Sequence, residues 1–78
     1  MSSAVIKLQC QLAQKLTDHR KSLGISQLDF GIMLGRDQYQ VCTWEKMARG
    51  EAVRKTMRLE TLVDTLERCK INITVNIE

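Results

Sequence analysis

The stretch LGRDQYQVCTWE, residues 34–45, decides the fold of this 78-residue chain. Gly35 can end a helix in the left-handed conformation, and the side chain of Asp37 can cap the helix that follows. Hydrogen-bonding side chains occupy residues 38–40, and Val41 and Trp44 then have the spacing of a buried helix face. The stretch predicts a tight turn between two helices, the second of which begins with an exposed polar turn.

Apolar residues at helical spacing continue on both sides of this stretch. A first helix is expected to end near Gly24, a second to begin after the cap Ser26, and a last helix to end near Lys70. A further short helix is expected between residues 51 and 57. The inner faces of the helices carry Leu8, Leu12, Leu16, Phe30, Leu34, Val41, Trp44, Leu59, Leu62, Val63 and Leu66.

The last eight residues, INITVNIE, change to a period of two, which predicts a strand. A single strand leaves its backbone hydrogen-bonding groups without partners, so the same strand of a second copy is the expected partner; a frayed tail is the alternative. The predicted fold is therefore all-α, a bundle of four to five helices in residues 1–70 with a C-terminal β-strand in residues 71–78 that pairs across a homodimer. The apolar face of the strand comprises Ile71, Ile73, Val75 and Ile77.

The charge balance is moderately basic, with 12 Lys and Arg against 9 Asp and Glu. Between residues 46 and 58, Glu51 is the only acidic residue among five basic ones. Such a cluster is compatible with a polyanionic partner, and a solvated face is the alternative. The basic residues are Lys46, Arg49, Arg54, Lys55 and Arg58.

Several classes of site are not expected from the residue pattern. The three cysteines are far apart and lack CxxC spacing, which argues against a disulfide framework and a zinc site. Paired carboxylates, a Cys/His pair and a phosphate-binding loop are missing from the sequence, so an enzyme or a cofactor is not expected. No segment approaches the roughly 20 apolar residues of a membrane span, and a cytoplasmic protein without membrane contact is expected.

An ordered set of residues resembles the lambda-repressor-like, XRE-type helix-turn-helix domain. The set consists of RKSLGISQ at 20–27, FG at 30–31, LG at 34–35, Val41, and WE at 44–45. The resemblance implies an ion pair between Arg20 and Glu45 that braces the first helix against the third. It also places Gly31 where the family uses a small residue, so that the two helices of the motif can cross closely.

The resemblance further implies that the helix after Asp37 enters the major groove of double-stranded DNA. Base contacts are then expected from Gln38, Tyr39, Gln40 and Thr43. Contacts to the DNA backbone are expected from Gln27, Arg36, Lys46, Arg49, Arg54 and Lys55.

The chain departs from the family pattern in three places. Gly50 comes later than the glycine that usually ends the recognition helix, so this helix is expected to run nearly a turn longer. Arg36 replaces an apolar turn residue, which predicts a more open turn or another phosphate contact. Leu28 and Ile32 occupy positions that are usually polar, which indicates a contact surface for a toxin, another partner protein or a second dimer, or two scattered apolar residues.

The layout of residues 59–78 resembles the C-terminus of HipB-type antitoxins. The function that this implies is a dimeric, sequence-specific transcriptional repressor that binds an inverted-repeat operator of its own operon. Three alternatives stay open: a phage Cro-like regulator, a controller protein of a restriction-modification system, and a helix-turn-helix module that binds protein without reading DNA.

Overall fold

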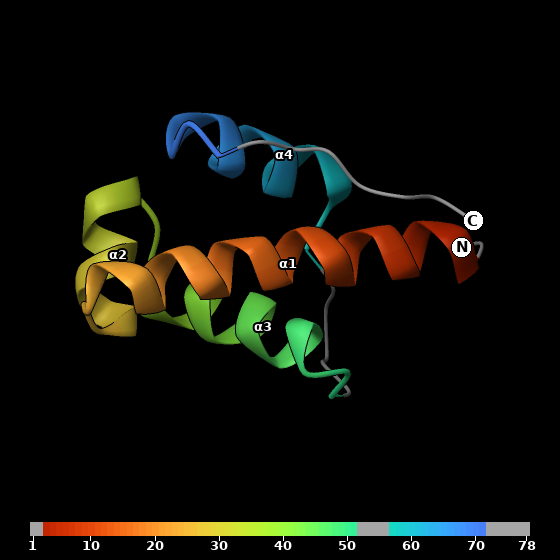
Figure 1. The fold of residues 1–78 in the computed structure, drawn as a ribbon, viewed down its shortest axis with the longest axis horizontal. Coiled ribbons are helices and arrows are strands. Elements are labelled where there is room, and N and C mark those ends of the chain that lie inside the picture. The colour runs from red at the N-terminus through yellow and green to blue at the C-terminus, as the bar shows by residue number, and fades with distance from the viewer. Residues whose placement is uncertain (1–2, 52–56, 72–78) are drawn as a thin grey trace.

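The computed structural model describes residues 3–51 and 57–71, and every regular element in these two ranges is a helix (Figure 1). The helices are α1 (Ser3–Leu23), α2 (Gln27–Leu34), α3 (Gln38–Ala48) and α4 (Leu59–Arg68). The all-α prediction and the four helices expected from apolar spacing are confirmed. The short helix expected between residues 51 and 57 and the strand beyond Ile71 lie outside the described residues.

Local signals in the sequence set the ends of α2. The Ser26 hydroxyl accepts a hydrogen bond from the backbone N–H of Asp29 at 3.1 Å, which satisfies one donor that the helix itself cannot. At the other end, Gly35 has a φ of +68° and its N–H donates to the carbonyl groups of Gly31 and Ile32. Only three residues, 35–37, therefore separate α2 from α3.

The core lies around α1, which packs against both α3 and α4 (Figure 1). Trp44 of α3 and Phe30 of α2 are fully buried, and their rings meet edge to face with centroids 5.8 Å apart. This arrangement is favourable for two aromatic rings beyond the apolar area that they bury. The buried apolar residues are Leu12, Ala13, Leu16, Phe30, Leu34, Val41, Trp44, Met47, Met57, Leu62 and Leu66.

Close packing explains the glycine inside α2. A Cβ atom on Gly31 would lie 3.0 Å from the carbonyl oxygen of Arg36 and 3.2 Å from that of Asp37. Both atoms belong to the backbone of the turn, which cannot move aside as a flexible side chain can. A small residue is required here as predicted, but the nearest atoms belong to the turn backbone rather than to the other helix.

The predicted ion pair between α1 and α3 is also present. Arg20 donates from Nε to Glu45 Oε2 at 2.5 Å and from Nη2 to Glu45 Oε1 at 3.0 Å. Its Nη1 donates to the carbonyl oxygen of Ile25 at 2.8 Å, which also fixes the loop after α1. The Arg20 and Glu45 side chains are only 17% and 3% exposed, so this pair is a buried brace rather than a surface contact.

Candidate functional site

A reciprocal pair of hydrogen bonds fixes the start of α3. The N–H of Gln40 donates to Asp37 Oδ1 at 2.8 Å, and the N–H of Asp37 donates to the side-chain oxygen of Gln40 at 3.4 Å. This capping box satisfies two backbone donors at once. The predicted cap Asp37 is confirmed, whereas the role of Gln40 in the cap was missed. Its amide oxygen is committed to the protein, and its NH₂ group is what remains for a ligand.

The first turn of α3 presents two large side chains to solvent. Gln38 is exposed, and Tyr39 is 67% exposed. One turn later, the half-buried Thr43 donates its hydroxyl hydrogen to the carbonyl oxygen of Tyr39 at 2.9 Å, so its oxygen remains as an acceptor. The predicted base-contact residues therefore lie together on the opening turns of α3, while Val41 and Trp44 face the core.

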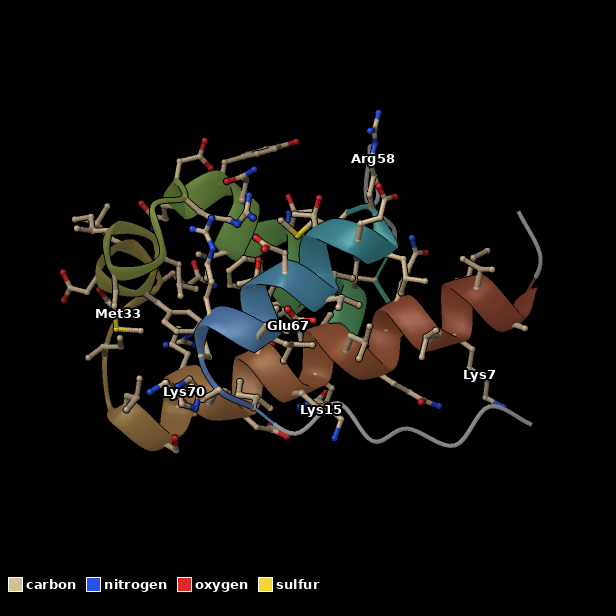
Figure 2. All side chains as sticks on the ribbon, turned by 90° about the horizontal axis from the view of Figure 1, so that it is seen from above. Lys7, Lys15, Met33, Arg58, Glu67 and Lys70 are labelled. Atoms are coloured by element: carbon tan, nitrogen blue, oxygen red, sulfur yellow. The ribbon has the colours of Figure 1, made fainter. Side chains whose placement is uncertain are left out.

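A shallow hollow of about 350 Å³ separates the start of α3 from the start of α4. The α4 side of the hollow includes Arg58 and Thr61. Figure 2 shows Arg58 on the edge of the molecule opposite Lys7 and Lys15, so those two lysines do not belong to this surface. Arg58 was missing from the predicted contacts, although it is the last member of the basic cluster that begins at Lys46. The α3 side is formed by Asp37, Tyr39, Gln40 and Thr43.

The far end of α3 carries the predicted cations Lys46 and Arg49, both exposed. The helix runs to Ala48, and Gly50 ends it with a φ of +75°, so the predicted longer helix is confirmed. Arg49 forms an ion pair with Glu51. This hydrogen bond raises the pKa of the Arg49 guanidinium and lowers the pKa of the Glu51 carboxyl group.

Two predicted phosphate ligands have partners within the protein. Gln27 donates its side-chain N–H to Glu45 Oε1 at 3.1 Å, which orients the amide and leaves its second N–H for a ligand. Arg36 is only 19% exposed and points to α4, where its Nε donates to Thr65 Oγ1 at 3.1 Å. The structure therefore does not group Arg36 with the exposed cations Lys46 and Arg58.

The carboxylate of the Arg20–Glu45 ion pair, which joins α1 to α3, is ionised. Burial alone would raise the pKa of Glu45, but hydrogen bonds from Arg20 and Gln27 outweigh burial and lower the pKa below its ordinary value. The residue that anchors α3 to α1 is thus charged at neutral pH, and through Gln27 it is linked to the edge of the candidate site.

Other predicted contacts divide into those that the structure describes and those that it does not. Leu28 and Ile32 are 51% and 69% exposed on α2, and Met33 beside them is 53% exposed. Ile71, the first residue of the predicted dimerisation strand, is half-buried and packs against the core of its own chain. The predicted contacts Arg54, Lys55, Ile73, Val75 and Ile77 lie outside the described residues.

This surface consists mainly of polar and basic side chains. Within residues 3–51 and 57–71, no three His, Cys, Asp or Glu side chains come together as a metal site. No helix in those ranges is both long enough and apolar enough to cross a bilayer. Comparisons with protein-family models, with curated proteins and with solved structures found no match to this chain.

Proposed function

We propose that this chain is a sequence-specific, double-stranded DNA-binding transcriptional repressor that places the start of α3 in the major groove. The observation that carries the proposal is the geometry of α2 and α3. A three-residue turn joins the two helices, and the capped first turn of the second exposes Gln38 and Tyr39. In helix-turn-helix proteins, this is the turn whose side chains contact base edges.

Each exposed side chain suits a particular part of a base pair. The amide of Gln38 can donate and accept in one plane, as the N6/N7 edge of adenine requires. Tyr39 can pack on a thymine methyl group or donate to a phosphate, and the Thr43 oxygen can accept from a base. Gln40 contributes through its NH₂ group alone, because its oxygen holds the cap.

Exposed cations flank these side chains and supply contacts to the DNA backbone. Lys46 lies at the far end of α3, and Arg58 lies across the hollow at the start of α4. The oriented amide of Gln27 adds a neutral donor, and Arg49 can bind phosphate by exchanging Glu51 for it. Contacts of this kind fix the orientation on DNA and make affinity dependent on salt.

The wider architecture follows from the proposal. In a lambda-repressor-like homodimer, residues 71–78 pair with the same strand of the second copy. Two α3 helices then meet half-sites of an inverted repeat about 34 Å apart. An autorepressor of the HipB-type antitoxin class is the form that best suits the resemblance of residues 59–78.

Selection from a library of random duplexes, followed by fluorescence anisotropy on the enriched sequence, tests this function. Specific sites exceed random DNA by about 10³-fold or more, and an inverted repeat is expected. Gln38→Ala is expected to weaken operator binding by roughly tenfold to a hundredfold and to leave random-duplex binding unchanged, because one bidentate base contact is lost. Equal losses on both duplexes would remove Gln38 from base recognition.

Two matched control variants test whether the effects depend on where the glutamine or lysine lies and not only on losing that residue type. Gln14 is an exposed glutamine on α1, bonded to Asp18 at 2.8 Å, so Gln14→Ala is expected to leave operator preference intact. Lys46→Ala should weaken binding to all duplexes and flatten the dependence of log affinity on log salt by about one unit. Lys7→Ala, on the opposite edge from Arg58 (Figure 2), should flatten this dependence less.

A second candidate function rests on a different surface. Leu28, Ile32 and Met33 are exposed together on α2, which favours a protein-interaction module in the same fold. Leu28→Glu combined with Ile32→Lys should abolish a protein complex and spare DNA binding if the two surfaces act separately. An unchanged set of complexes would leave these residues without a partner role.

A further inference from the structure

The turn between α2 and α3 is tied to α4 by two arginines that reach in opposite directions. From the turn, Arg36 donates through Nε to Thr65 Oγ1 at 3.1 Å, and its Nη2 lies 3.6 Å from Asp64 Oδ2. From α4, Arg68 donates through Nη1 to the carbonyl oxygen of Leu34 at 3.4 Å. Its Nε lies 3.3 Å from Asp64 Oδ2, so one carboxylate joins both arginines.

The buried residue Thr65 fixes the geometry of this cluster. Thr65 has no exposed surface, and its hydroxyl donates to the carbonyl oxygen of Thr61 at 2.7 Å. With its hydrogen engaged there, the oxygen can only accept, and the Nε–H of Arg36 supplies the donor. The cluster therefore depends on the guanidinium, which donates to Thr65 and forms an ion pair with Asp64 at the same time, in a way that an ammonium group does not reproduce.

Among the described residues, these side chains link α4 to the pair α2 and α3 through polar contacts. Both α3 and α4 pack against α1, and α2 packs against α3, whereas direct backbone packing of α4 on α2 or α3 is slight. The hollow of about 350 Å³ lies between the starts of α3 and α4. The relative placement of Tyr39 on one side and Arg58 on the other thus depends on the packing of both helices on α1 and on how the turn is held against α4.

We infer that Arg36, Asp64, Thr65 and Arg68 form a turn clamp that sets the angle of α3 relative to α4 and thereby determines base preference. The inference rests on the proposed function. In the clamp, Arg36 is a positioning residue rather than a phosphate ligand. The clamp matters because α3 must meet base edges while Arg58 meets the backbone of the same duplex. If α3 shifts, its basic side chains stay near the phosphates, but its first turn no longer lines up with the base edges, so sequence preference falls.

Arg36→Met and Thr65→Val, alone and combined, test the clamp by anisotropy on the selected operator and on random duplex. Each single variant should lower the operator preference about tenfold, because each breaks the same hydrogen bond, and the double variant should lose little more. Log affinity against log salt should keep its slope in Arg36→Met. Glu67→Gln, an exposed carboxylate on the same helix, is the matched control and should bind as the parent does.

A phosphate role for Arg36 gives the opposite pattern and overturns the clamp. In that case Arg36→Met flattens the salt slope by about one unit and weakens operator and random duplex alike, and Thr65→Val binds as the parent does. Asp64→Asn, at a residue about half exposed, provides a milder variant that folds if Thr65→Val does not. The operator preference of Asp64→Asn should lie between the preference of the parent and that of Arg36→Met.

A DNA-free measurement separates failure of the clamp from failure of the proposed function. Amide hydrogen exchange of residues 35–37 should accelerate at least threefold in Arg36→Met and in Thr65→Val, without additivity in the double variant. If the parent shows no operator preference but this coupling is present, the clamp stands as a structural device and the DNA-binding proposal fails. Additive or absent effects on exchange overturn the clamp whatever the protein binds.

Discussion

Replacing Glu45 by Gln should destabilise this protein severely at neutral pH. Glu45 is 3% exposed and holds the 17% exposed Arg20 by two hydrogen bonds, so the variant leaves a nearly buried guanidinium without its counter-charge. Breaking such a pair costs about 3–5 kcal/mol. We expect the lower end, about 3 kcal/mol, because the Gln side chain keeps one carbonyl oxygen as an acceptor.

This loss is large relative to the total stability. A domain of 78 residues unfolds with a free energy of roughly 4–12 kcal/mol. At about 4–8 °C per kcal/mol, the thermal midpoint should fall by roughly 12–24 °C, measured by circular dichroism at pH 7. Glu67→Gln, an exposed carboxylate, should shift the midpoint by less than about 3 °C.

The pH dependence of the same comparison has a definite sign. Because the native pKa of Glu45 is lowered, its contribution to stability is fully present above the ordinary glutamate value of about 4.3. The contribution is lost as the pH falls through the lowered native pKa. The midpoints of the parent and of Glu45→Gln should therefore converge below about pH 4. A variant within about 3 °C of the parent at pH 7, or a gap that persists unchanged at pH 3, would refute the buried brace.

Three further predictions concern the turn, the cap and the cation at the end of α3. Gly31→Val should lower the free energy of unfolding by about 2 kcal/mol in urea titrations, since its Cβ would press on the Arg36 carbonyl; an unchanged midpoint would contradict this packing. Asp37→Ala should cost about 1 kcal/mol in thermal melts and Asp37→Asn much less, whereas equal costs would argue against the side-chain cap. Glu51→Gln should tighten binding to random duplex by roughly twofold to fivefold in anisotropy at low salt, because it releases Arg49; unchanged affinity would show that the ion pair does not compete with phosphate.

Much of the fold could be predicted because its signals are local. Ser26, Gly35 and Asp37 mark helix ends by the chemistry of their own side chains or backbone, and each acts within a few residues of its position. Apolar spacing of 3.6 residues then gives the inner faces of the helices. The pairing of Arg20 with Glu45, 25 residues apart, was accessible only through the resemblance of the whole pattern to a known family.

The remaining features depend on contacts that no local pattern encodes. Arg36 was predicted at the DNA backbone because it replaces an apolar turn residue of the family pattern, but its partner Thr65 lies 29 residues away on α4. Gln9 likewise donates to the carbonyl oxygen of Met57 at 2.9 Å, across 48 residues. The role of Gln40 in the cap, by contrast, was predictable from the sequence. A glutamine three residues after a capping Asp is a known capping-box signal.

At the start of α3, the side chains that cap the helix differ from those that are exposed, and this separation affects which positions can change during evolution. Asp37 and Gln40 hold the helix end, while no hydrogen bond found among the described residues uses the side chain of Gln38 or Tyr39. Substitutions at residues 38 and 39 therefore remove none of the side-chain hydrogen bonds that hold the described residues together. Under the proposed function, one copy could acquire a new DNA target after gene duplication through these two positions, while the capping side chains stay unchanged.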